Sequence, residues 1–323
     1  MKVLLTGGNG LLGHNIIKKL IADRHHINAI VRRPESILLE HPDLKVVEGS
    51  FANYDQLLEC ADGCDAIIHV AAATDMSLEY LEFETVNLKG SENVLRVADT
   101  LDIKRIVYIS TLNTIGYGTA TNHATEEAEI EYPFSESYYA ITKKMAEDLF
   151  VQASKKADRH IVIINPGYMI GAYDTKPSSG QMLMMAYKKP IMAAPMGGKC
   201  FVHVTDVATA AVNALTMGRN GNRYIAANHN MTIIDFYRLQ KKVCKYHQIV
   251  LPIPTTITNL VGKLGDIVRK MGIKTQVCSI NTKQLCIKEY YNSTKAQQEL
   301  NMPNTPMEQA IQDFIDWQYG KKK

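Results

Sequence analysis

The chain has 323 residues, 46% of them hydrophobic and 21% charged, as is typical of a soluble globular protein with one large or two moderate domains. Its net charge is +3, with acids and bases mixed along the chain, which argues against a dedicated nucleic-acid binder. The six cysteines form no Cys-x-x-Cys pair, and no apolar run approaches the ~20 residues of a membrane span. The chain opens directly on "KVLLTGG", without a charged and apolar leader. We therefore expect a cytoplasmic protein with no metal site and no membrane or nucleic-acid partner.

Strand-like and helix-like segments alternate through the first half of the chain. Short runs rich in Val, Ile and Leu predict strands at 2–6, 27–31, 44–49, 65–72, 104–110 and 160–167. Amphipathic patterns between them predict helices at 11–23, 54–61, 81–100 and within 135–147. Strands with few charges, separated by helices, indicate an α/β fold with a doubly wound parallel sheet covered on both faces.

The pattern changes after Gly167. The segment that follows is rich in Met, Gly and Pro and has no clean period, whereas 203–218 is again helix-like and 223–227 strand-like. We expect a first domain at 1–167, to which 200–228 returns, and a smaller, mostly helical second domain formed by 168–199 and 229–323. An amphipathic helix at 255–271 is expected to pack on its own domain rather than to lie on a membrane.

A glycine-rich loop joins the first strand to the first helix. In "LLTGGNGLLG", Gly7, Gly10 and Gly13 permit a tight turn and a close backbone approach to a pyrophosphate. The free N–H groups at the start of the following helix, near Leu11 and Leu12, would bind the anion. Because a strand precedes the motif and a helix follows it, this pattern predicts a dinucleotide site rather than a structural turn.

The end of the second predicted strand indicates which dinucleotide binds. An acidic residue there would accept from the ribose 2′-OH of NAD, whereas an arginine would pair with the 2′-phosphate of NADP. Arg32 and Arg33 occupy this place, and no acid occurs before Glu35. We therefore expect NADP(H) in preference to NAD(H), with solvated arginines and NAD(H) as the alternative.

One tyrosine and one lysine are in helical register within "SESYYAITKKMAE". Tyr139 lies four residues before Lys143, whereas Tyr138 faces Thr142. A phenol has a pKa of ~10, and a nearby ammonium together with a positive nicotinamide ring would lower it. The phenol could then exchange a proton with a substrate oxygen. A hydroxyl that polarises this oxygen would come from "YISTLNTIGYG", at Ser110 or Thr111, where the fifth strand ends.

Several motifs together resemble the extended short-chain dehydrogenase/reductases of the NAD-dependent epimerase/dehydratase superfamily. These are "TGGNGLLG", "AIIHVAA", "VNLKGSENVL", "ISTLNTIGYG", "YAITKKMAE", "INPGYMIG" and "FVHVTDVATA". The resemblance implies a Rossmann-type sheet with Thr111 as the catalytic hydroxyl, Tyr139 as acid/base and Lys143 as its partner. Asn87 would be the structural or proton-relay asparagine. Further cofactor contacts are implied at Ser50, Phe51, Ala71, Ala72, Ser110, Pro166, Gly167 and Met169, with Ser50 standing where the family has an adenine-contacting Asp.

Two further stretches, "NPGYMIGAYDTKPSSG" and "YYNSTKAQQELNM", are similar to the dihydroflavonol-4-reductase-like and hopanoid-associated epimerase-like branch. Sugar-nucleotide dehydratases of the family carry Asp-Glu after the catalytic threonine, where this chain has Leu112 and Asn113. We expect a reductase of a ketone or aldehyde. The alternative is a nucleotide-sugar epimerase with an internally cycling cofactor, and a non-catalytic NADP sensor is disfavoured because the Tyr–Lys pair is present.

The segment from Tyr168 to Met196 is expected to wall the substrate pocket, because ligands of open α/β sheets bind beyond the carboxyl ends of the strands. It contains no arginine that could hold a diphosphate but is rich in methionine, which suits an irregular apolar ligand. The substrate would be a small carbonyl or hydroxyl compound, with a homodimer as the candidate assembly. Packing of the second domain is the alternative role of the methionines. The residues assigned to the substrate are Asn113, Tyr168, Tyr173, Met182 and Met185.

Overall fold

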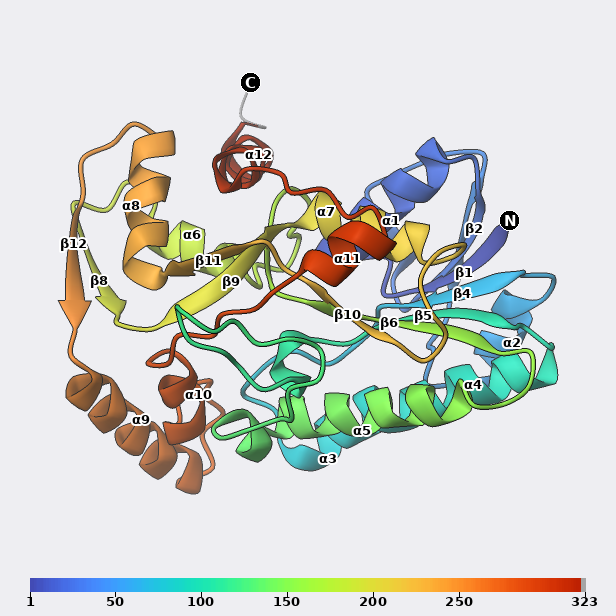
Figure 1. The fold of residues 1–323 in the computed structure, drawn as a ribbon, viewed down its shortest axis with the longest axis horizontal. Helices are drawn as coiled ribbons and strands as arrows, with labels where there is room; N and C mark the ends of the chain where they lie inside the picture. The colour runs from blue at the N-terminus through green and yellow to red at the C-terminus, as the bar shows by residue number, and fades with distance from the viewer. Residues whose placement is uncertain (321–323) are drawn as a thin grey trace.

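The computed structural model describes residues 1–320, so residues 321–323 of the expected second domain lie outside the described part. A seven-stranded sheet with the order β10-β6-β5-β4-β1-β2-β3 runs through the molecule (Figure 1). All of its strand pairs are parallel, which confirms the expected fold class. The strands are β1 (Lys2–Thr6), β2 (His26–Val31), β3 (Leu44–Glu48), β4 (Ala66–His69), β5 (Arg105–Ile109), β6 (His160–Pro166) and β10 (Arg223–Ala226).

Helices cover both faces of this sheet, because its strands are apolar on both sides. In β1, Val3 and Leu5 point into one hydrophobic core and Leu4 into the other, and all three are fully buried. The first core lies under α1 (Leu11–Ala22) and α7 (Val204–Asn213). The second lies under α2 (Tyr54–Ala61), α4 (Gly90–Thr100) and α5 (Tyr138–Ala153).

The helix expected at 81–100 is interrupted. It consists of α3 (Tyr80–Phe83), a wider π-helical turn at Glu84–Lys89, and α4. The wide turn contains Asn87, which is buried. Such turns occur inside α-helices and often mark functional sites, but the apolar period of a sequence does not reveal them.

The second region, which packs against the carboxyl ends of the sheet, contains short strands that the sequence pattern did not predict. One small sheet has the order β11-β9-β7, and β12 pairs with β8. These strands are β7 (Tyr168–Ile170), β8 (Ile191–Pro195), β9 (Gly198–His203), β11 (His229–Thr232) and β12 (Ile249–Ile253). The helices are α6 (Gly180–Ala186), α8 (Ile233–Val243), α9 (Thr255–Lys270), α10 (Ser279–Gln284) and α12 (Met307–Tyr319), whereas α11 (Thr294–Glu299) packs against β10 of the large sheet. Within residues 1–320, no helix is both long and apolar enough to cross a bilayer.

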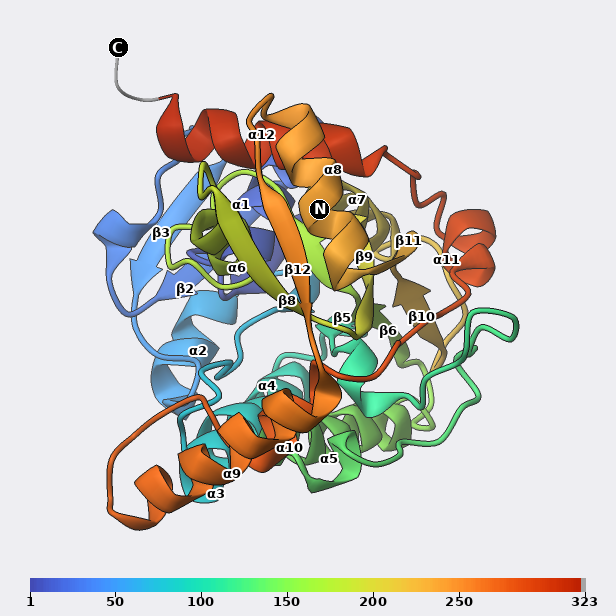
Figure 2. The same ribbon diagram turned by 90° about the vertical axis from the view of Figure 1, so that its left-hand side faces the viewer.

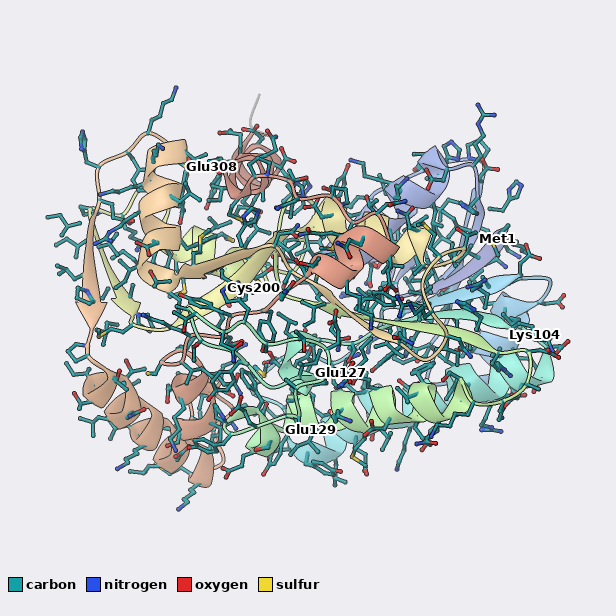
Figure 3. The ribbon with its side chains drawn as sticks, in the orientation of Figure 1. Met1, Lys104, Glu127, Glu129, Cys200 and Glu308 are labelled. Atoms are coloured by element: carbon teal, nitrogen blue, oxygen red, sulfur yellow. The ribbon has the colours of Figure 1, made fainter. Side chains whose placement is uncertain are left out.

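The direction of the sheet places its functional edge at the centre of the molecule. Met1 and Lys104, which precede β1 and β5, lie at one end, whereas Cys200 on β9 lies near the middle (Figure 3). The carboxyl ends of the strands therefore point toward the second region. In open α/β sheets, ligands bind at this edge.

Candidate active site

The glycine loop between β1 and α1 is shaped by close backbone contacts. Gly7 has φ +74°, and a Cβ on it would lie 2.7 Å from the Ala71 amide nitrogen. A Cβ on Gly13 would lie 2.0 Å from the Gly7 carbonyl oxygen. Gly10, at the N-cap of α1, supplies no side-chain cap, so the first N–H groups of the helix are not satisfied by a side chain. This loop fits a pyrophosphate, and the side chains of Leu11 and Leu12 are buried behind it.

A buried polar cluster that the sequence reasoning missed fixes the neighbouring turn after β4. The Thr6 hydroxyl lies 2.6 Å from His69 Nδ1 and accepts from the backbone nitrogens of Val70 and Ala71, each at 3.2 Å. His69 Nε2 lies 3.2 Å from the Ser91 hydroxyl. Burial lowers the pKa of His69 to about 3, so the imidazole is neutral at neutral pH. The cluster holds the backbone that lines the loop, including half-buried Ala72.

The two arginines assigned to the ribose are exposed at the end of β2. Arg32 lines a shallow depression together with Glu48, Gly49, Ser50 and Gln56. The sequence reasoning missed Glu48, because it belongs to β3 and reaches the same depression only through strand pairing. Both a cationic and an anionic side chain therefore border the place where a ribose would bind.

Phe51, which follows Ser50, packs on the other side of this loop. Its ring centroid lies 5.5 Å from that of His69. A Cβ on Gly90 would lie 2.3 Å from the Phe51 ring, so only glycine leaves room for this contact at the start of α4. Phe51 thus connects the loop after β3 to the buried cluster around His69.

Lys143 on α5 is buried beside the end of β5. Its Nζ donates to the Ile109 carbonyl oxygen at 2.7 Å and lies 4.3 Å from the Tyr108 ring centroid. Burial lowers its pKa to about 7, while the carboxylate of Glu147, one turn further along α5, acts in the opposite direction. The ammonium is therefore directed to the backbone of β5.

Tyr139 is half-buried at the start of the same helix, and its ring centroid lies 6.0 Å from that of Phe83. Burial raises the pKa of its phenol, and the hydroxyl of Thr111 acts in the opposite direction. The lowered pKa expected from the sequence rests on Lys143 together with a positive nicotinamide ring, so it stays a prediction for the enzyme with its cofactor bound. In the protein alone burial dominates, and the Lys143 ammonium bonds the Ile109 carbonyl oxygen.

The turn after β5 carries the predicted hydroxyl side chains. Thr111 Oγ1 accepts from the Asn113 amide nitrogen at 3.3 Å and so caps the short helical turn that follows. Ser110 is buried, with its hydroxyl 3.5 Å from that of Thr114. Of the two, Thr111 is the hydroxyl that interacts with Tyr139.

Behind this turn lies a second buried network that the sequence reasoning missed. Glu147 Oε2 accepts from Thr114 Oγ1 and from Asn165 Nδ2, each at 2.8 Å. Asn165 Nδ2 also donates to the Thr111 carbonyl oxygen at 3.1 Å, and Arg223 Nη1 lies 3.5 Å from Glu147 Oε1. The position of Glu147, four residues after Lys143 on one helix face, was the available signal. The network joins α5, β6 and the turn after β5.

Asn87 links the wide helical turn to the start of α5. Its Oδ1 accepts from the Ala73 amide nitrogen at 2.7 Å, and its Nδ2 donates to Thr142 Oγ1 at 3.1 Å. Thr142 Oγ1 in turn donates to the backbone oxygen of Tyr138 at 2.8 Å. Asn87 therefore holds the helical turn that carries Tyr139.

The residues expected to line the nicotinamide follow β6. Pro166 is buried at the end of this strand. A Cβ on Gly167 would lie 2.4 Å from the Cys200 carbonyl oxygen, so the chain passes closely between the sheet and β9. Met169 packs against the core beside α1 and α7, and its backbone oxygen accepts from the Ser179 hydroxyl.

The side chains assigned to the substrate are mostly engaged in packing. Tyr168 and Met182 pack against the core of the second region. Tyr173 stacks on His14 of α1, with ring centroids 5.4 Å apart, and Met185 is 56% exposed. These contacts agree with the alternative that the methionine-rich segment serves packing, while Asn113 remains next to Thr111.

The chain matches the model of the family described as "NAD dependent epimerase/dehydratase family" over residues 3–228. The chain belongs to this family. The matched stretch contains the glycine loop, the turn after β5 and the Tyr139–Lys143 helix. The protein is therefore an enzyme of the extended short-chain dehydrogenase/reductase type, and its family binds nicotinamide dinucleotides.

Relatives in this family span different reactions. A protein of Synechocystis sp. with the provisional name dihydroflavonol 4-reductase is 27% identical, covering 97% of this chain and 93% of the relative. A Stigmatella aurantiaca protein named 4-hydroxy-2-methyl-3-oxo-4-farnesyl-3,4-dihydroquinoline-1-oxide ketoreductase is 31% identical over 69% of this chain and 67% of the relative. The structure of Thermotoga maritima UDP-glucose 4-epimerase superposes with a TM-score of 0.79 at 18% identity, covering 100% of both chains. This last likeness shows the shared fold.

Proposed function

We propose that the protein is an NADP(H)-dependent reductase of an apolar ketone or aldehyde. The observation that carries this proposal is that α5, with Tyr139 and Lys143, packs against the turn that carries Thr111 at the carboxyl end of β5. Two hydroxyls at this edge can hold one carbonyl oxygen. Residues 1–167 and 200–228 would bind the cofactor, and 168–199 with 229–323 would bind the substrate.

The protein side chains have distinct roles in this reaction. A reduced nicotinamide, when bound, supplies the hydride. Thr111 would donate a hydrogen bond to the substrate carbonyl, and Tyr139 would deliver the proton to the same oxygen. A phenol, with an ordinary pKa of ~10, carries its proton at neutral pH and can therefore donate it to the developing alkoxide. Lys143 would be the partner of Tyr139 in this step, with its Nζ held by the Ile109 carbonyl oxygen.

The residues around the glycine loop support a bound dinucleotide. A Cβ on Gly7 or Gly13 would collide with neighbouring backbone, so these glycines permit the tight turn that presents the N-terminus of α1 to a pyrophosphate. Arg32 and Arg33 are exposed at the end of β2 and free to approach a 2′-phosphate. These arginines support NADP(H), whereas Glu48 on the same depression is the feature that would favour NAD(H).

The chemistry of the second region supports an apolar substrate. The segment 168–196 contains no arginine that could clamp a diphosphate. The Stigmatella aurantiaca relative, which aligns with this chain over 67% of its own length, is named as a ketoreductase of a farnesylated quinoline. An apolar carbonyl compound is therefore favoured over a sugar nucleotide.

A substrate screen tests this proposal. NADPH and NADH oxidation would be followed with a panel of apolar ketones and aldehydes, and binding of UDP and GDP would be measured by calorimetry. We expect turnover of an apolar ketone with NADPH and no binding of either nucleotide. Micromolar binding of UDP or GDP that competes with the substrate but not with NADPH would contradict the proposal and favour the epimerase.

A further inference from the structure

Helix α9 packs on the protein through its small residues. Its buried positions are Thr258, Gly262 and Gly265, which lie three to four residues apart on one face. A Cβ on Gly262 would lie 2.1 Å from the Thr282 hydroxyl of α10, and one on Gly265 would lie 2.2 Å from the Val277 carbonyl oxygen. The helix is therefore seated on α10 by its glycine face, at the margin of the molecule (Figures 1 and 2).

The apolar side of α9 consequently points outward. We define the outward apolar face as Ile257, Leu260, Val261, Leu264, Ile267 and Met271, which are between 45% and 71% exposed. Their spacing of three and four residues places them on one stripe of the helix. The helix packs on its own domain, as the sequence predicts, but it does so through its glycines rather than through its apolar stripe. Exposed apolar stripes of this kind mark interaction sites.

Basic side chains border this stripe. Lys263 and Lys270 follow one edge of the outward apolar face, both are exposed, and neither forms an ion pair with any residue in the described part of the chain. Residues 255–277 contain four basic residues and one acidic residue. That acid, Asp266, accepts from the Ser279 backbone nitrogen at 2.9 Å. Lys263 and Lys270 therefore place positive charge along this edge of the stripe.

Helix α9 and the loop that follows it are bonded to residues 76–83, the segment that lies beside Tyr139. Arg269 Nη2 donates to the Met76 carbonyl oxygen at 2.5 Å, and Lys274 pairs with Glu82 at 3.1 Å. The next residue of that segment, Phe83, contacts the ring of Tyr139. A partner on the outward apolar face would therefore lie next to the segment beside the candidate active site.

We propose that the outward apolar face of α9 docks on the surface of an anionic lipid bilayer. Apolar side chains flanked by lysines let a helix lie in the membrane interface, with the stripe among the acyl chains and the ammonium groups at the anionic headgroups. A second copy fits less well, because an antiparallel pair of these faces would bring the lysine edges together. The proposal departs from the sequence expectation that the protein has no membrane partner. It concerns a surface rather than turnover, so it stands independently of the proposed reductase function.

Vesicle co-sedimentation of the full chain tests the proposal. Vesicles of phosphatidylcholine alone would be compared with vesicles that also contain phosphatidylglycerol, at low and high salt. We expect binding to the anionic vesicles that weakens with salt. The double variant Leu260→Glu/Leu264→Glu should lose at least about tenfold in partitioning. The matched control is Leu38→Glu, which changes a 49% exposed leucine far from α9 in the chain and should bind like the wild type.

The charge-reversal variant Lys263→Glu/Lys270→Glu separates the lipid from a protein partner. It should lose binding to the anionic vesicles while its circular dichroism melting curve stays at the wild-type position, because both side chains are exposed. Absence of wild-type binding to any vesicle would overturn the proposal. So would a wild-type oligomer, measured by light scattering, that dissociates in the Leu260→Glu/Leu264→Glu variant without any vesicle binding.

Discussion

The seven-stranded sheet and helix α9 place polar and apolar side chains in opposite ways. Around the seven-stranded sheet, polar groups such as His69 and Glu147 are buried within hydrogen-bonded networks. In the second region, α9 exposes its leucines and buries its glycines. The contrast teaches that the surroundings of the sheet are built to hold a fixed geometry, because buried polar groups tolerate few alternative arrangements. Helix α9 instead offers surface for contacts with other molecules.

A matched pair of leucine substitutions tests this contrast in stability. Leu4 is fully buried in the sheet, whereas Leu264 is 55% exposed on α9. We expect Leu4→Ala to lower the free energy of unfolding by about 2–5 kcal/mol through the lost contacts and the cavity left behind. Leu264→Ala should change it by less than about 0.5 kcal/mol. Urea unfolding measures both, and equal losses in the two variants would contradict the contrast.

The same contrast explains how much of the fold could be predicted. Strands such as β1 and β6 are short, apolar on both faces and bounded by turns, so their local pattern is enough to identify them. Strands β8 and β12 are partly exposed and pair only with each other, so their sequences carry no clear alternation. Their existence depends on contacts between segments far apart in the chain, which a local pattern does not contain.

The candidate site was predictable only where one element determines the geometry. The register of Tyr139 and Lys143 follows from a single helix. The contacts of Glu147 with Asn165 and Thr114 join three elements, so no spacing in the sequence reveals them. The hydrogen bond from Lys143 to the β5 backbone likewise depends on how α5 packs on the sheet. The burial that raises the pKa of Tyr139 depends on the same packing.

The arginines at the end of β2 allow a test at the ribose end of the cofactor site. We expect the double variant Arg32→Ala/Arg33→Ala to bind NADPH about tenfold to a hundredfold more weakly, because a charge-assisted contact contributes roughly 1.5–3 kcal/mol. Binding of NADH should change little. Fluorescence titration of both cofactors measures this, with Arg24→Ala as an exposed arginine control. Unchanged NADPH affinity, or tighter binding of NADH than of NADPH by the wild type, would count against the preference for NADP(H).

The buried imidazole of His69 predicts a loss of stability in acid. Its folded pKa is lowered from 6.5 to about 3, so between these values the unfolded chain binds the proton more readily than the folded one. Stability should therefore fall as the pH drops below 6.5, by up to ~1.4 kcal/mol per pH unit from this group. Urea unfolding at pH 7 and pH 5 should show a smaller pH-dependent loss, by about 2 kcal/mol, in His69→Gln than in the wild type. The exposed His247→Gln control should keep the wild-type dependence, and an identical dependence in all three proteins would refute the role of His69.

The most direct test of the proposed reductase compares the two adjacent tyrosines at the start of α5. Tyr139 interacts with the Thr111 hydroxyl, whereas the ring of Tyr138 is 43% exposed and packs edge-on against Tyr80. Single-turnover NADPH oxidation with the substrate found by the ketone screen should fall ~10²–10⁴-fold in Tyr139→Phe, with NADPH affinity nearly unchanged. Tyr138→Phe should react at close to the wild-type rate. Full activity in Tyr139→Phe, or an equal loss in both variants, would contradict the assignment of Tyr139 as the proton donor.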